Sequence, residues 1–124
     1  MQGTVDREAD RRARAVDLLG ERGRTPLMFA VESQAWDIFH YLVGVECDLT
    51  LVEEAGKHNA LQLALLLGET DAAIAILNAK KVPEVVFTNR AEKGWTALEL
   101  ATLKEQAGEP AMAEVVRLIK KRHP

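Results

Sequence analysis

Cysteine, aromatic residues and long hydrophobic runs are all scarce in this sequence of 124 residues. Its single cysteine, Cys47, excludes an intramolecular disulfide and a cysteine-based metal site, which favours a reducing, intracellular compartment. Aromatic residues make up only 5% of the chain, while alanine and leucine supply much of a 48% hydrophobic content. This composition favours closely packed helices over a β-sandwich.

Long apolar segments and a large net charge are also missing. Apolar runs such as Leu63 to Leu67 are far shorter than the ~18 residues of a spanning helix. Charged residues occupy the N-terminal positions where a signal peptide has its apolar run. The net charge of −3 is too small to indicate a polyanionic partner. We therefore expect a cytoplasmic protein that binds neither membrane nor nucleic acid, with Lys120 to Arg122 keeping a nuclear location as the alternative.

Residues that could carry catalysis are sparse and scattered. Ser33 is the only serine, and no glycine-rich phosphate loop occurs. The histidines, His40, His58 and His123, do not stand at metal-ligand spacing with each other or with Cys47. The sequence therefore predicts neither an enzyme nor a bound cofactor.

One six-residue pattern occurs three times. "TPLMFA" begins at Thr25, "NALQLA" at Asn59 and "TALELA" at Thr96, with spacings of 34 and 37 residues. Thr and Asn are good N-cap residues, and the pairs Asn59–Gln62 and Thr96–Glu99 have capping-box spacing. A repeat of this length indicates an array of small structural units.

Each repeat predicts two helices. First helices are expected at about 26–33, 60–67 and 97–107, and second helices at about 35–44, 71–79 and 110–122, from apolar residues at i, i+3 and i+4. Neither helix can bury its apolar stripe alone, so neighbouring repeats must stack. The β-prone runs Leu49–Val52 and Val85–Phe87 predict short β-hairpin fingers between them, and an amphipathic segment at 6–20 predicts an N-terminal cap.

The three motifs resemble the Thr-Pro-Leu-His-x-Ala signature of ankyrin repeats, and the resemblance covers roughly residues 22–122. It implies an all-α, ankyrin-like solenoid of stacked antiparallel helix pairs with short β-hairpin fingers. The whole chain is then a single domain. Its expected parts are an N-terminal capping helix at 1–21 and repeats at 22–55, 56–92 and 93–124.

Two departures from the family pattern affect rigidity. The family's histidine ties adjacent repeats together through backbone hydrogen bonds, and Met28, Gln62 and Glu99 replace it here. Gln62 and Glu99 can compensate locally through their capping boxes, whereas Met28 cannot, so we expect the first repeat boundary to be the loosest. Glu46 and Lys80 stand where the family has glycine, and a left-handed conformation there costs each about 1 kcal/mol.

The resemblance also implies a role in binding other proteins through finger tips and the concave face. Arg24, His58 and Trp95 precede the three N-caps and are expected at the base of the fingers. Trp and Arg are frequent in binding hot spots. The alternative for Trp95 is that its ring folds back onto its own finger.

Three further residues are candidates for partner contact. Trp36 either contacts a partner or covers Phe39 at the start of its helix, and the second interpretation is favoured. Val86 and Phe87 belong to an apolar finger run, which is expected to combine pairing with partial exposure. The predicted function is a protein–protein interaction module with an unidentified protein partner, a monomer being favoured. The alternative is a structural subunit of a larger assembly.

Overall fold

The computed structural model describes residues 23–123, which form seven α-helices and contain no strand. The helices are α2 (Pro26–Ser33), α3 (Trp36–Gly44), α4 (Ala60–Leu66), α5 (Thr70–Leu77), α6 (Glu84–Thr88), α7 (Ala97–Gln106) and α8 (Met112–Arg122). The all-α class is thus confirmed. The expected β-hairpins are wrong for this range, and the predicted cap at 6–20 lies outside it.

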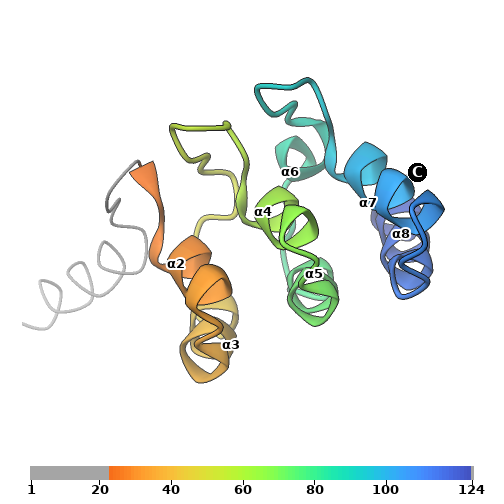
Figure 1. Ribbon diagram of the computed structural model, residues 1–124. Coiled ribbons are helices and arrows are strands. Elements are labelled where there is room, and N and C mark those ends of the chain that lie inside the picture. Colours follow the sequence, from red (N-terminus) through yellow and green to blue (C-terminus); the bar gives the residue numbers. More distant parts are fainter. Residues whose placement is uncertain (1–22, 124) are drawn as a thin grey trace, which may run out of the picture.

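Six of the helices form three antiparallel pairs that lie side by side (Figure 1). The pairs are α2 with α3, α4 with α5, and α7 with α8. The first helices contact one another in the order α2, α4, α7, and the second helices in the order α3, α5, α8. The loops between pairs project from the helices (Figure 1). We call residues 47–59 the first loop and residues 89–96 the second loop.

The three first helices begin as their N-caps predict. The Thr25 side chain accepts a hydrogen bond from the Met28 N–H. Asn59 and Thr96 each complete a capping box, with Gln62 and Glu99 respectively. Because capping depends only on residues within one turn, these starts could be located from the sequence.

Each first helix also ends in the same way, on a residue in the left-handed conformation. The φ angles are 58° at Gln34, 74° at Gly68 and 101° at Gly108. Each of these N–H groups and the N–H that follows bond back to carbonyls three and five residues earlier, as in a Schellman motif. Gln34 therefore adopts a backbone conformation that the other two repeats assign to glycine.

Two further positions test the expected left-handed caps. Glu46 follows the C-cap of α3 with φ 56°, and the Cys47 N–H donates to the Leu42 carbonyl in a further Schellman motif. Lys80 is not in the left-handed region, so the cost of that conformation does not arise there. The chain after α5 continues toward α6 instead of forming this cap.

Helix α6 replaces the strand expected over Val85–Phe87. Pro83, with φ −58°, precedes its first turn. Val86 is fully buried and Phe87 is 6% exposed, and the Phe87 ring stacks on His123 with 5.2 Å between ring centroids. Packing against the core and the end of α8 thus overrides the β-propensity of this run.

Candidate functional site

A groove of about 510 Å³ joins the two loops to the first helices. It receives residues from the segment before α2, from both loops and from all three first helices. Its lining consists of Arg24, Glu32, Glu53, Ala55, Gly56, His58, Leu63, Leu66, Leu67, Glu92, Lys93, Trp95 and Leu100.

The groove brings together three residues that the repeat pattern selects. Arg24, His58 and Trp95 stand immediately before the three N-caps, and all three line it. Their equal repeat position explains why stacking brings them into one row. The Trp95 side chain is 38% exposed, so part of its ring remains accessible within the groove.

The floor of the groove is apolar. Leu63 and Leu100 are buried, whereas Leu66 and Leu67 are 44% and 46% exposed. Sequence reasoning did not select these two residues. The run of three leucines at the end of α4, Leu65 to Leu67, could have identified them. One face of a helix cannot bury three consecutive side chains, so part of such a run must be exposed.

Two charged side chains of the groove lining, Glu53 and Arg24, already have partners. The Glu53 carboxylate accepts a hydrogen bond from the Gly56 N–H at 2.8 Å and lies 2.9 Å from His58 Nδ1. Burial alone would raise the pKa of Glu53, but these hydrogen bonds and the nearby positive charges of His58 and Arg24 lower it below its usual value. Arg24 forms an ion pair with Glu32. These pairings hold the first loop in a defined shape.

A buried amide network fixes the second loop to α4. Gln62 is fully buried, and its Nε2 donates to the carbonyls of Asn89 and Trp95, each at 2.8 Å. Its Oε1 accepts from the Asn59 N–H at 3.0 Å and from Asn89 Nδ2 at 2.6 Å. Asn59 Nδ2 donates in turn to the Val86 carbonyl at 3.0 Å.

Hydrogen bonds between repeats, which were expected to be lost with the family's histidine, are present at Gln62. Gln62 makes its capping box and also spans the distance to the next loop, which was not anticipated from its spacing to Asn59. Met28 occupies the equivalent place in α2 and is fully buried, but a thioether supplies no N–H donor. Met28 therefore cannot make, at the first boundary, the two hydrogen bonds that the Gln62 amide donates at the second.

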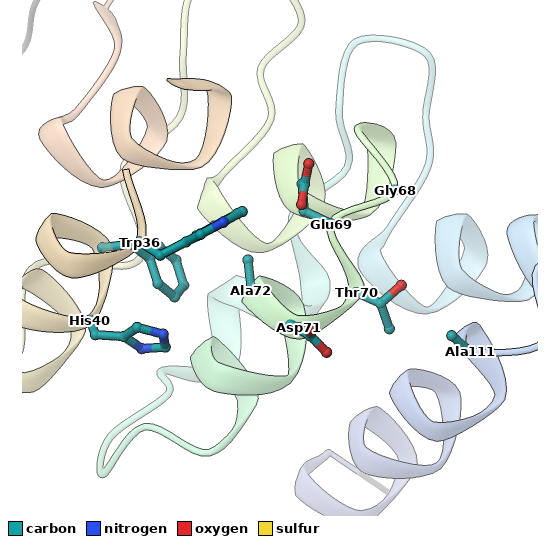
Figure 2. A pocket seen from close by; sticks show the side chains of 9 residues that line it. Trp36, His40, Gly68, Glu69, Thr70, Asp71, Ala72 and Ala111 are labelled. Carbon is teal, nitrogen blue, oxygen red and sulfur yellow. The ribbon is translucent and has the colours of Figure 1, made fainter. Parts of the chain in front are cut away.

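Trp36 lies outside this groove, in a pocket of about 570 Å³. Figure 2 shows Trp36 and His40 reaching from α3 toward the start of α5, with Ala111 on the far side. The Trp36 ring packs edge-on against Phe39, with centroids 5.7 Å apart. This contact fits the favoured interpretation, in which Trp36 covers Phe39.

Val86 and Phe87 do not belong to an exposed surface. Both are buried in α6, so the expected partial exposure is wrong for these two side chains. The neighbouring Val85 is 48% exposed, because it points away from the face of α6 that packs on the core.

Among residues 23–123, no group of three or more His, Cys, Asp or Glu side chains could hold a metal ion. No helix within this range is long and apolar enough to span a membrane. No protein-family model matches the chain, and a comparison with curated proteins finds no match. The groove and the repeated backbone are therefore the basis for a functional assignment.

Proposed function

We propose that the chain is an ankyrin-like repeat domain that binds a protein partner in the groove between its loops and first helices. The observation that carries this proposal is the row of Arg24, His58 and Trp95 in one groove with an apolar floor. The array of helix pairs with a repeated left-handed position after each first helix supports the ankyrin-like assignment.

The chemistry of the groove favours an apolar side chain of the partner. Leu66, Leu67 and Trp95 are partly exposed and lose water when an apolar group covers them. Two of the charged side chains in the lining already have partners, as Arg24 does in Glu32 and Glu53 in His58. A leucine, methionine or aromatic residue therefore gains more in this groove than a charged one.

The groove is also held in place before binding. The amide of Gln62 anchors the second loop, and the hydrogen bonds of Glu53 fold the first. A preformed surface loses little conformational entropy on association. This is the mechanism by which a small repeat domain binds without bond-making chemistry.

Site-specific photo-crosslinking tests the proposal. A photoreactive amino acid at Leu67 should capture a partner protein from cell extract, and the same group at Tyr41 on α3, which is 55% exposed, should not. Trp95→Ala should lower recovery about tenfold or more, as expected for a hot-spot residue, without unfolding the protein, because the hydrogen bond from Gln62 goes to the Trp95 backbone.

Equal capture from both positions, or undiminished recovery by a folded Trp95→Ala variant, would refute the groove as the binding site. Phe87 is unsuitable for this test because it is buried, and truncating it would destabilise the fold.

The alternative role, a structural subunit of a larger assembly, has one observation in its favour. Phe29 and Ile38 on the first helix pair are 55% and 57% exposed and line an apolar groove of about 320 Å³. Exposed apolar surface of this kind often marks a subunit interface. Light scattering during size-exclusion chromatography separates the roles: an obligate oligomer supports the structural subunit, and a stable monomer supports the independent module.

A further inference from the structure

Two basic segments far apart in the sequence meet at the ends of α5 and α8. Lys80 and Lys81 follow α5, and Lys120, Lys121 and Arg122 form the last turn of α8. The Arg122 guanidinium donates to the Ala79 carbonyl at 2.9 Å, and the two helices are in contact. All five side chains are exposed. We call them the basic patch.

Helix electrostatics account for only part of this charge. The C-terminal end of a helix carries roughly half a negative charge, so α5 and α8 together supply about one. The carboxylate of Glu84 also faces this region, where it lies 3.3 Å from His123 Nε2. Glu46 lines the same pocket as Lys80. Glu114 is paired with Arg117, and its carboxylate also attracts Lys121. With Glu46 counted, five fixed cations exceed the negative charges by roughly two.

The patch is also available for binding. Arg122 donates one hydrogen bond to the Ala79 carbonyl. Within residues 23–123, none of the four lysines forms an ion pair with a carboxylate. An exposed group of unpaired cations repels itself, and an anionic ligand relieves that repulsion. The surplus charge therefore points to a ligand rather than to fold stability.

We propose that the basic patch binds an acidic segment of a protein partner, rich in Asp and Glu. This surface is separate from the groove, since none of its residues lines that groove. Charge complementarity over a short distance suits such a segment, because screening limits attraction to about 8 Å at physiological salt. A long polyanion such as nucleic acid would also face the rest of a chain whose net charge is −3, which weakens its attraction.

Fluorescence anisotropy with a labelled oligo-glutamate peptide tests this proposal on the full chain. The wild type should bind the peptide, and binding should weaken as salt rises. A triple variant, Lys80→Gln, Lys81→Gln and Lys121→Gln, should bind about tenfold more weakly, as expected when three exposed charge pairs are lost. Replacing the same three lysines with arginine should preserve binding.

A matched control removes the same charge elsewhere. Lys57→Gln, Arg90→Gln and Lys104→Gln remove three cations that belong neither to the patch nor to the groove lining, and should leave peptide affinity within twofold of the wild type. The proposal is overturned by absence of peptide binding, by an equal loss in this control variant, or by tighter binding to single-stranded DNA or phosphatidylserine vesicles than to the peptide. The groove variant Trp95→Ala should bind the peptide normally, so failure here and failure of the groove are distinguishable.

Discussion

Replacing Gln62 with glutamate isolates the two hydrogen bonds that its amide nitrogen donates to the second loop. Glutamate has nearly the same shape, and its carboxylate can still accept from the Asn59 N–H and from Asn89 Nδ2. It cannot donate to the carbonyls of Asn89 and Trp95, which lie 2.8 Å from the present nitrogen. Two acceptors would then face a negative charge at a fully buried position.

The size of the effect follows from these contacts. Two lost hydrogen bonds cost about 1 kcal/mol each, and an unpaired buried charge costs several kcal/mol more unless the group takes up a proton. We expect Gln62→Glu to lower the free energy of unfolding by about 3–4 kcal/mol at neutral pH. That loss corresponds to a fall of roughly 1–2 M in the urea midpoint.

The variant should also respond to pH with a defined sign. Burial raises the pKa of the introduced carboxyl in the folded state above its unfolded value near 4.3. The destabilisation is therefore complete above the folded pKa and is relieved as pH falls through it, since the protonated group can donate one hydrogen bond. The difference between variant and wild type should shrink between about pH 7 and pH 5.

Glu99→Gln is the matched control, because Glu99 occupies the equivalent place in the third repeat. Its side chain is 42% exposed and lies 3.1 Å from Arg90, so the control should cost less than about 1 kcal/mol. Urea unfolding followed by circular dichroism and tryptophan fluorescence measures both. If Gln62→Glu lowers the free energy of unfolding no more than Glu99→Gln does, the network does not hold the second loop against α4.

Three other outcomes follow from the structure. Glu46→Gly should raise the free energy of unfolding by about 0.5–1 kcal/mol because it relieves a left-handed conformation, whereas Lys80→Gly should not; an unchanged urea midpoint for Glu46→Gly would contradict this. The lowered pKa of Glu53 means that its contribution is present above the unfolded pKa and lost as pH falls below about 4.5, so Glu53→Gln should reduce the pH dependence of the melting temperature there. Gly56→Ala would place a methyl group against the His58 ring and should displace the ring, lowering the free energy of unfolding by about 1–3 kcal/mol in the same urea assay. A His58 resonance unchanged in NMR spectra would argue against this packing.

Local signals in the sequence were sufficient for most of the helices. The six paired helices begin and end within about two residues of their predicted bounds, because caps and apolar spacing act over a single turn. The resemblance to ankyrin repeats marked Glu46 as a position where the family has glycine, and Glu46 does adopt the left-handed conformation. The row of Arg24, His58 and Trp95 followed from their common repeat position, and the groove lining contains all three.

Long-range contacts determined the features that were predicted wrongly or missed from the sequence. Val86 and Phe87 have strong β-propensity, yet burial against the core and His123 makes them helical. Gln62 reads as a capping residue, and only the folded chain brings the carbonyls of Asn89 and Trp95 to its amide. These two hydrogen bonds of Gln62 leave no local signal in the sequence, because Asn89 and Trp95 are 27 and 33 residues away.

The sequence by itself determined where helices start and that they repeat, since N-cap chemistry and apolar periodicity are properties of neighbouring residues. Only the tertiary structure decided which side chains remain exposed and which are buried between stacked repeats. Leu66 and Leu67 stay accessible, Met28 and Gln62 do not, and Lys80 meets the end of α8 through the hydrogen bond from Arg122 to Ala79. Surfaces depend on how repeats pack on one another, and that packing is a property of the whole chain.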